Sequence, residues 1–493
     1  MKTTAVRRLA LLFCALFLAQ TMTACSDTPA ETESTENDTT AVTETVDPEA
    51  ERLAEKEAYY SALNKVSEPG AEISFLSETG DIAVEEITGE KFNDAMYNRN
   101  LEVEERLDVT LNVLEQDDNV ATIIANNVIS GDGTYDVISA RTQFVATMLQ
   151  NGHLLDMKTI PNMQLEEKWW NQSAIKNFSL AGFQYCVLSE LCHLTRTTAD
   201  MILMNKELCI DHGMEVPYDA VREGKWTYDM MYEMCQQLPY DSNGDGVMDW
   251  NDTRGFTGGS VFITYAMVAG GVDYFVKDEN DIPVFSLMSE TNVNYFDRLF
   301  NILSDRDRFL YYDNTTGLTN GWSFIVNKFL SGDSLFLQCS PGGMPTYSQM
   351  EQDYSVLPLP KIDESQESYR SKTSDGFSSV ICVSKVFDAE DGDIGLVLDA
   401  MSFLSQVDLL PTYVNSYLES RWVRDEDSVE MMQIAFENIY FDPAFVLDSV
   451  WGDPMDVAGS VFTSGSNTFV STVKSKQPAI EAAVQKTVEN LNK

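Results

Sequence analysis

Twelve residues starting at Asp241 have the side-chain types and the spacing of a calcium-binding loop. Oxygen-bearing side chains stand at positions 1, 3, 5, 9 and 12 of this segment, a glycine stands at position 6, and position 7 can supply its main-chain carbonyl. A hard cation needs about six or seven oxygens that converge from one tight turn, and this spacing provides them. The predicted metal ligands are Asp241, Asn243, Asp245, Val247, Asp249 and Asp252.

The sequence on either side of this loop predicts a structural ion rather than a sensor. A helix from Thr227 to about Leu238 leads into the loop, but residues 253–256 after it predict a loop or strand instead of a second helix. Asp252 at position 12 is shorter than the usual glutamate and can bind through one oxygen only. The alternative is a hydrated Asx turn without metal, because an acidic chain contains chance runs of Asp and Asn. We expect Ca²⁺ to clip a surface loop with an affinity of about 10⁻⁴–10⁻³ M.

Elements that could position a second site begin near residue 70. Short apolar runs predict strands, and the longer segments between them predict helices. In chain order, these segments are 73–76 (strand), 90–107 (helix), 109–113 (strand), 118–129 (helix), 135–139 (strand) and 142–151 (helix). The alternation indicates an α/β fold with parallel layers. Ligands of such sheets bind at the carboxyl ends of strands, so the turns at 77–79 and 139–142 are the expected binding positions.

The charge of the chain excludes several classes of partner. The 493 residues include 78 Asp plus Glu against 33 Lys plus Arg, which gives a net charge of −45. Such a surface repels phosphate groups, so we expect no nucleic-acid partner. The sequence also lacks the motifs of a serine-hydrolase elbow, a phosphate-binding loop, a dinucleotide-binding turn and a zinc protease. These absences favour a binding protein over an enzyme.

The first 24 residues have the features of an export signal. Basic residues up to Arg8 precede an uncharged apolar run, 9–19, that is too short to span a bilayer comfortably. Small residues and then Cys25 follow, a pattern that resembles the bacterial lipoprotein signal. This resemblance implies a signal peptide at 1–24 and a lipid such as palmitate on Cys25, which would anchor the protein on the extracellular face of the cell membrane. An ordinary cleaved secretory signal is the alternative.

Residues 25–68 predict a disordered tether. This stretch is rich in acidic residues and threonine, so it cannot bury enough apolar surface to offset the entropy lost on ordering. Repulsion between its like charges extends it, which would hold a folded domain away from the membrane.

Several short segments, taken in order, carry a resemblance to a known family. They are 98–106, 131–139, 150–156, 169–171, 205–208, 224–227, 241–252, 354–361 and 424–428. Together they resemble the family 1 extracellular solute-binding lipoproteins of Gram-positive ABC importers, the broad group that contains maltose-binding protein. The resemblance extends over about residues 70–493.

The resemblance implies a periplasmic-binding-protein-like α/β fold of type II, in which two lobes are joined by a three-segment hinge. The implied crossings lie near 184–192, 375–382 and 422–428. The implied lobes are 69–185 with 380–425 for lobe 1, and 186–375 with 426–493 for lobe 2, which includes the calcium loop. The lobes would close on the ligand by a hinge motion and present the closed form to a permease.

The resemblance also implies ligand contacts in lobe 1. Glu78 and Thr79 lie in the turn after the first predicted strand. Ser139 and Arg141 carry over by position from a loop that contacts sugar in maltose-binding protein. For Arg141, the alternative is a solvated residue at the start of a helix.

Three further contacts are implied outside these two turns. Glu190 lies on the first crossing, Ser340 follows the predicted strand 335–337, and Trp451 is placed like a stacking tryptophan near the chain end. Each has an alternative. Glu190 would be an exposed acid, and Trp451 would be a buried structural residue. Ser340 begins a Ser-Pro-Gly-Gly segment that departs from the aromatic version of the family.

The resulting prediction is a lipid-anchored, non-enzymatic receptor that captures a carbohydrate and delivers it to an ABC transporter permease. Sugars are bound by polar side chains that match hydroxyls and by aromatic faces that pack on the ring, and we expect an oligosaccharide ligand and a monomeric protein. Two alternatives stay open. One is a secreted glycoside hydrolase or lyase, because an acidic chain offers many carboxylate pairs. The other is a binding lipoprotein for a peptide or another solute, without a permease.

Overall fold

The computed structural model describes residues 47–116, 120–131, 133–239, 241–314, 320–387, 392–419 and 422–491. The chain divides into two units, residues 1–51 and residues 52–493. Of the first unit, only 47–51 are described, so the predicted signal peptide and Cys25 lie outside the described residues. The second unit contains both main sheets.

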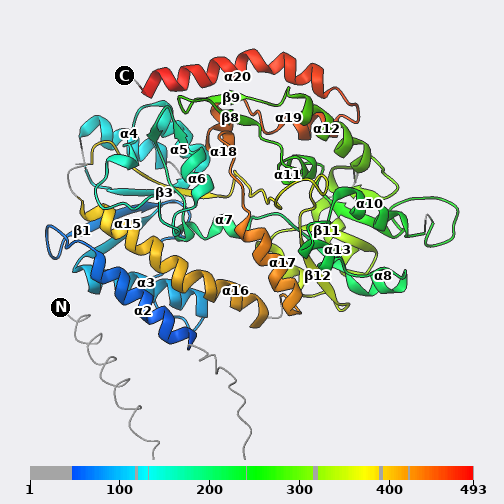
Figure 1. Ribbon diagram of the computed structural model, residues 1–493, viewed down its shortest axis with the longest axis horizontal. Helices are drawn as coiled ribbons and strands as arrows, with labels where there is room; N and C mark the ends of the chain where they lie inside the picture. The colour runs from blue at the N-terminus through cyan, green and yellow to red at the C-terminus, as the bar shows by residue number, and fades with distance from the viewer. Residues whose placement is uncertain are drawn as a thin grey trace, which may run out of the picture. The chain divides into compact units, whose positions relative to one another are not determined.

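The first main sheet has four strands in the order β13-β3-β1-β2. Figure 1 labels β1 and β3 of this sheet. Its strands are β1 (Glu72–Ser77), β2 (Thr110–Glu115), β3 (Val137–Arg141) and β13 (Ser379–Val383). The helices that alternate with them are α3 (Lys91–Leu107), α4 (Val120–Ser130) and α5 (Thr142–Gln150). β1 pairs in parallel with both β2 and β3, and β13 pairs antiparallel to β3. The predicted strand and helix alternation is confirmed here, and this sheet is the core of lobe 1.

The second main sheet has five strands in the order β10-β7-β11-β6-β12 and forms lobe 2. Its strands are β6 (Met201–Asn205), β7 (Arg254–Gly258), β10 (Phe309–Tyr311), β11 (Ser334–Cys339) and β12 (Tyr354–Pro358). The helices between them include α8 (Lys206–Asp211), α9 (Tyr218–Arg222), α10 (Tyr228–Gln236), α11 (Phe262–Ala269), α12 (Glu290–Leu303) and α13 (Gly321–Leu330). β7, β10 and β11 are parallel, whereas β6 runs antiparallel to both of its neighbours. The carboxyl ends of the three parallel strands therefore lie at one edge.

Shorter elements complete the two lobes and the segments between them. They are α2 (Pro48–Ala62), η1 (Met157–Thr159), α6 (Gln172–Asn177), β4 (Ser179–Leu180), β5 (Phe183–Gln184), η2 (Glu190–Cys192), α7 (Leu194–Thr197), β8 (Phe275–Lys277), β9 (Pro283–Phe285), η3 (Tyr312–Asn314), η4 (Pro341–Gly343) and α14 (Met344–Tyr347). The C-terminal part contributes α15 (Asp393–Leu404), η5 (Ser405–Leu409), α16 (Leu410–Glu419), α17 (Glu426–Glu437), α18 (Ala444–Leu447), η6 (Asp448–Val450), α19 (Val457–Thr463) and α20 (Phe469–Leu491).

A continuous apolar helical stretch lies in the core of lobe 1. α15 is buried at every residue and passes through a π turn, η5, into α16. Among the described residues, the stretch 393–416 is long and apolar enough to cross a membrane, but 72% of its apolar window is buried inside the protein. A helix that is apolar on all sides packs in a core. The buried carboxylate of Asp399 at its centre accepts from the indole N–H groups of Trp169 (2.9 Å) and Trp170 (3.0 Å).

The tether prediction does not hold for its second half, because α2 is an ordered helix. From residue 52 onward, this helix is fixed to lobe 1 by charge and by a buried hydroxyl. The ammonium of Lys56 donates to Glu102 (2.6 Å) and to Asp408 (2.9 Å), and the hydroxyl of Tyr59 donates to Asp399 (3.0 Å). The composition of this stretch did not indicate an ordered helix, because the residues that stabilise it lie far away in the sequence.

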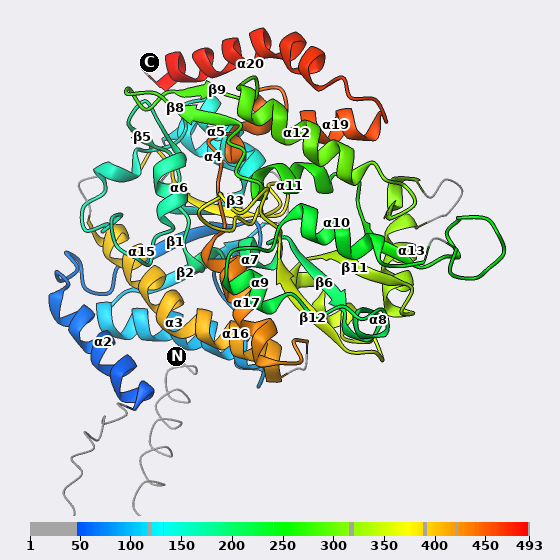
Figure 2. The same cartoon turned by 45° about the vertical axis from the view of Figure 1, so that its right-hand side comes forward.

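The C-terminal helix α20 begins at Phe469 and contains Pro478 in its interior. One face of this helix is apolar, and Ile480, Val484 and Val488 on it are buried. α20 lies alongside β9 and α19 (Figure 2).

Segments of the chain pass between the lobes at several places. The main chain of Val187 bonds to that of Ile381 in β13, and the main chain of Ser371 bonds to those of Tyr440 and Asn438. A third passage joins α16 to α17, which packs on β12. The C-terminal part differs from the expected assignment to lobe 2 alone, because α18 packs on α5 of lobe 1.

Candidate functional site

Glu78 and Arg141 form one unit at the carboxyl ends of β1 and β3. The Glu78 amide donates to the Ser139 carbonyl (2.9 Å), which seats the turn after β1 against β3. The Arg141 amide donates to Glu78 Oε2 (2.8 Å), and its guanidinium pairs with Glu78 Oε1. The Glu78 side chain is 1% exposed, whereas that of Arg141 is 29% exposed. Arg141 therefore presents the polar surface of this pair, and Glu78 orients it.

Thr79 and Ser139 donate hydrogen bonds to a buried carboxylate, that of Asp81, next to this pair. Both hydroxyls donate to Asp81 Oδ1, at 2.7 Å from Thr79 and 3.0 Å from Ser139, and the Ser379 hydroxyl donates to Asp81 Oδ2. Ser139 is fully buried, so its hydroxyl holds the turn and offers no surface. The structure thus brings four of the predicted residues together, and it gives them different roles.

The crossing 371–379 touches the edges of both sheets. On the lobe 1 side, the hydroxyl of Thr142 donates to the Asp375 carbonyl (2.7 Å). On the lobe 2 side, the Asp200 amide donates to the Lys372 carbonyl (2.9 Å). Two residues after Asp375, the ring of Phe377 is 68% exposed. This crossing therefore carries an exposed aromatic ring close in sequence to its contacts with both lobes.

A buried lysine supports the crossing from within. The ammonium of Lys372 donates to the carbonyl of Thr373 (3.0 Å), lies 3.4 Å from Asp375 Oδ1, and sits 4.7 Å from the ring centroid of Tyr265. Burial opposes its charge, but Asp375 and the other groups around it outweigh burial and raise its pKa. Lys372 stays charged and fixes the Asp375 turn.

The parallel strands of lobe 2 end in a polar edge with aromatic rings beside it. Gln338 at the end of β11 accepts from the Gly259 amide (3.0 Å) and donates to Asp200 (3.1 Å), so it joins two neighbouring turns. Trp322, 38% exposed, packs edge-on against Tyr312 with 6.0 Å between ring centroids. Ser340 caps η4 at the same edge and is half-buried. Aromatic rings therefore stand near this edge, although Ser340 itself is not aromatic.

Glu190 and Trp451 are engaged within the protein. The Glu190 carboxylate pairs with Arg196, whose guanidinium lies 5.0 Å from the Phe436 ring centroid, and the space beside them measures only about 10 Å³. Trp451 is 1% exposed and donates through Nε1 to Thr487 (3.1 Å). The structure therefore places Trp451 in the core, as the alternative interpretation stated, and places Glu190 in hinge packing rather than as an exposed acid.

The sequence interpretation missed several exposed groups. Phe377 is the clearest, followed by Trp322 and Tyr312. Phe377 stands in the polar run Thr373-Ser374-Asp375-Gly376-Phe377, and a single aromatic residue in such a run is a signal that could have been used. No comparable signal marks Trp322, which lies in an apolar helix.

The loop 241–252 lies between α10 and β7. The Asp241 carboxylate accepts from the amides of Gly244 (2.7 Å) and Gly246 (2.7 Å). Gly244 and Gly246 have φ angles of 78° and 85°, a region that favours glycine. These contacts wrap the main chain around the side chain at position 1.

Asp252 closes the loop through main-chain bonds. Its carboxylate accepts from the amides of Ser242 (2.9 Å) and Asp249 (2.8 Å). These hydrogen bonds lower the pKa of Asp252, and the bond from Asp249 has the largest effect. Within the described residues, the loop carboxylates do not gather three oxygens within 4.8 Å. The oxygen donors of the loop suit a hard cation. Asp252 differs from the other predicted ligands because both of its carboxylate oxygens already accept hydrogen bonds from amides of the loop.

Comparison with known proteins identifies the fold. No family model matches the sequence, and no curated protein matches it. Solved structures match over most of the chain. An acarbose-binding receptor, GacH of Streptomyces glaucescens, is 15% identical, with 85% of this chain and 99% of that chain covered and a TM-score of 0.51.

Two further solved structures agree with this match. A family 1 extracellular solute-binding protein from Bifidobacterium longum subsp. infantis is 13% identical and has a TM-score of 0.50. The match covers 84% of this chain and 99% of that protein. A cyclic α-maltosyl-1,6-maltose-binding protein from Arthrobacter globiformis is 12% identical, covers 84% and 99%, and has a TM-score of 0.52. The predicted two-lobed solute-binding-protein fold is thereby confirmed.

Proposed function

We propose that this chain is a family 1 extracellular solute-binding protein that captures an oligosaccharide between its lobes and delivers it to an ABC transporter permease. In this proposal it binds its solute unchanged, is anchored through a lipid on Cys25, and acts as a monomer. The single observation that carries the proposal is the crossing 371–379, which bonds to Thr142 next to the first sheet and to Asp200 next to the second, and which carries the exposed ring of Phe377. A ligand held there contacts both lobes, so its binding favours the closed arrangement.

The side chains at this place suit a sugar. A pyranose ring has an apolar face that packs on an aromatic ring and hydroxyls that need fixed polar partners. Phe377 supplies the ring, and the partly exposed guanidinium of Arg141, held by Glu78, supplies N–H donors. Two of the matched proteins are an acarbose-binding receptor and a cyclic α-maltosyl-1,6-maltose-binding protein, which supports a carbohydrate as the first class to test.

The test is a thermal-shift titration of the purified protein with maltose, maltotetraose and acarbose, with short peptides as a comparison. A solute present at about 100 times its dissociation constant adds about 2.7 kcal/mol of apparent stability. We expect at least one sugar to raise the melting temperature in a saturable way. No response to sugars together with a response to a peptide would replace the proposed ligand class.

Two variants connect such a response to the site. Phe377→Ala removes the exposed ring, and we expect it to weaken sugar binding at least tenfold because the packing surface is lost. Ile210→Ala removes an apolar side chain of similar exposure on α8, 67%, and we expect no change. Equal affinity in both variants would place the sugar elsewhere. Sustained release of reducing ends by the protein would favour the glycoside hydrolase instead.

The anchor and the transport partner need tests of their own. We expect labelled palmitate to be incorporated into the full chain expressed in a Gram-positive host, and Cys25→Ser to abolish this incorporation and release the protein to the medium. For the partner, we expect co-purification of a multispanning permease with the anchored protein. Membrane association that persists in Cys25→Ser would argue against the lipid.

Calcium in the loop 241–252 belongs to the same proposal as a structural ion. Its supports are the oxygen spacing and the observed wrapping of main-chain amides around Asp241. When bound, the ion would supply a clip between the end of α10 and the start of β7, and the residues that would hold it are the six predicted above.

A further inference from the structure

Two buried cysteines lie on neighbouring segments where the chain passes between the lobes. Cys186 precedes Val187 in the first crossing, 184–192, and Cys382 follows Ile381 in β13. Both side chains are fully buried, and both thiols are free in the structure. The packing of the two segments therefore fixes where these thiols lie.

Main-chain hydrogen bonds set the register of the two segments. The Val187 amide donates to the Ile381 carbonyl (2.8 Å), and the Ile381 amide donates to the Val187 carbonyl (2.9 Å), in an antiparallel bridge. Residues that exchange both bonds form a hydrogen-bonded pair, and the next pair along an antiparallel ladder is not hydrogen-bonded. One step along, that next pair is Cys186 and Cys382, which are directly opposite each other.

A pair of this kind has the geometry that a disulfide needs. In a non-hydrogen-bonded pair, the Cα atoms are about 4.5 Å apart and the two side chains leave the same face of the ladder. Disulfides join Cα atoms that are about 4.4–6.8 Å apart, so the main chain needs no rearrangement. The carbonyl of Cys186 accepts from the Gln184 side chain (2.8 Å), which agrees with a position that gives no main-chain bond to β13.

We propose that Cys186 and Cys382 are a disulfide site, which is oxidised as the chain folds in contact with an oxidant of the disulfide class. One thiolate of the pair attacks the oxidant disulfide and releases one oxidant thiol, and the second thiolate attacks the mixed disulfide and releases the other. One S–S bond replaces two S–H bonds of the protein, and the oxidant takes up the two electrons and two protons.

The environment of the thiols decides when this reaction takes place. Burial first, and then the neighbouring thiol of Cys382, raise the pKa of Cys186 well above its usual range, and burial also raises the pKa of Cys382. Only a thiolate attacks a disulfide, so both groups react slowly once the two segments have packed. Oxidation of the pair therefore belongs to folding, before the sulfurs are enclosed.

The bond would join the two lobes at the base of lobe 2. The loop that it closes, 186–382, contains all five strands of the second main sheet, whereas Cys382 itself belongs to the first. A crosslink that closes a long loop lowers the entropy of the unfolded chain and so stabilises the native state. The oxidised protein should therefore unfold at a higher temperature than the reduced protein.

The experiment is refolding of the full chain from urea, either in a mixture of oxidised and reduced glutathione or in dithiothreitol. Free thiols are then alkylated in denaturant, and tryptic peptides are mapped by mass spectrometry. We expect the glutathione sample to lose two reactive thiols per chain and to contain peptide 177–196 crosslinked to peptide 373–385. Retention of all thiols, or pairing of Cys186 or Cys382 with another cysteine, would overturn the proposal.

Cys192→Ser is the matched control, because Cys192 is also buried and lies in the same tryptic peptide as Cys186. We expect Cys186→Ser to lose the crosslink and Cys192→Ser to keep it. Oxidised wild type should share the circular dichroism spectrum of the reduced form and melt several degrees higher, and dithiothreitol should reverse this rise. A crosslink that persists in Cys186→Ser, or an oxidised form that melts lower than the reduced one, would contradict the assigned register.

Discussion

The main-chain amide of Arg141 donates to the carboxylate of Glu78 across 2.8 Å, and the same carboxylate also holds the Arg141 guanidinium. One acid thus fixes both the main chain and the side chain of Arg141, the last residue of β3 and the residue before α5. The carboxylate is almost fully buried, while the arginine reaches solvent. This arrangement gives the turn after β3 a single orientation before any solute arrives.

Arg141→Met is expected to destabilise the protein and to weaken solute binding. It leaves the Glu78 charge buried without its guanidinium, and breaking such a pair costs about 3–5 kcal/mol. Urea unfolding should show this loss, and Glu78→Gln/Arg141→Met should recover part of it because the charge is gone as well. Lys225→Met, which breaks an exposed pair with Glu223, should cost much less, because solvent screens an exposed ion pair. Equal losses in the two single variants would contradict the burial argument.

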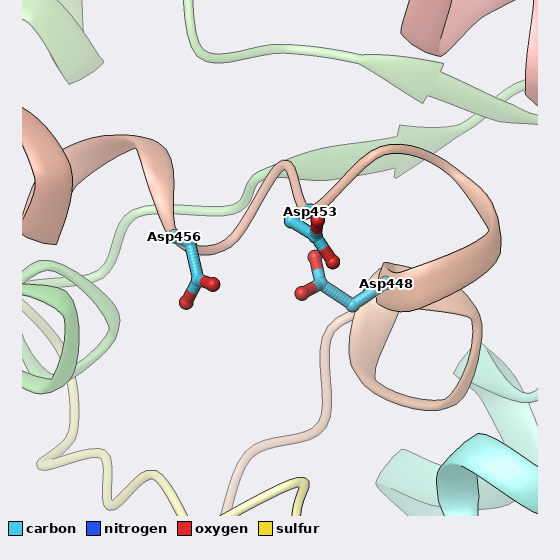
Figure 3. Close-up of side chains that lie close together, drawn as sticks. All are labelled: Asp448, Asp453 and Asp456. Carbon is cyan, nitrogen blue, oxygen red and sulfur yellow. The ribbon is translucent and has the colours of Figure 1, made fainter.

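Asp448 should make the protein less stable as pH rises. Burial above all, and then the neighbouring acids Asp375, Asp456 and Asp453, raise its pKa to about 8, against about 3.9 in an unfolded chain. Figure 3 shows Asp448 with Asp453 and Asp456. The native state therefore holds a proton that the unfolded state has lost between about pH 4 and pH 8, and stability falls with pH across this window.

The check is urea unfolding of wild type and Asp448→Asn from pH 5 to pH 8.5, with a chelator present throughout. The variant has no charge to bury, so we expect its advantage over wild type to grow with pH to about a few kcal/mol. Asp211→Asn on the surface of α8 should show no such trend. A constant difference at all pH values would mean that Asp448 does not titrate in this window.

Removal of calcium should lower the melting temperature through the loop 241–252. With a dissociation constant of about 10⁻⁴–10⁻³ M, 10 mM Ca²⁺ adds about 1.4–2.7 kcal/mol relative to chelator. Differential scanning calorimetry of wild type should show this response. Asp241→Asn/Asp245→Asn should lose most of it, and Asp211→Asn should keep it. A full response in the loop variant would assign the calcium effect to another site.

Gly395→Ala should destabilise the protein although alanine favours helices. Gly395 lies inside α15, where alanine gains about 1 kcal/mol over glycine in an exposed helix. Here an added Cβ would overlap the carbonyl oxygen of Pro161, which is main chain and cannot move aside cheaply. We expect a net loss of about 1–3 kcal/mol in urea unfolding. Gly133→Ala, where a Cβ meets open space, should be nearly neutral.

The sequence predicted those parts of the fold that depend on local pattern. Apolar runs at β1 and β3 located the strands within two residues, with Glu78 directly after β1 and Arg141 at the carboxyl end of β3. The glycine and aspartate spacing of the loop at Asp241 also predicted its wrapped turn. These features follow from residues close together in the chain, so the pattern alone is informative.

Features that depend on distant partners were not predictable in this way. Lys56 belongs to an acidic, polar stretch, and its order depends on Asp408, which is more than 350 residues away. The roles of Thr79 and Ser139 depend in the same way on Asp81. Both hydroxyls donate to its buried carboxylate and are therefore not available to a ligand. Trp451 was ambiguous because burial of an indole is decided by packing, and here Thr487 satisfies its N–H.

The attachment of α2 has a mechanical consequence. From residue 52 onward, the helix is bonded to α3 and to the α15–α16 stretch through Lys56 and Tyr59, and all of these partners belong to lobe 1. A pull on the chain from its N-terminal side therefore enters the protein through lobe 1. In an anchored molecule, lobe 1 would stay with the anchor while lobe 2 swings, so the surface that travels toward a partner would be that of lobe 2.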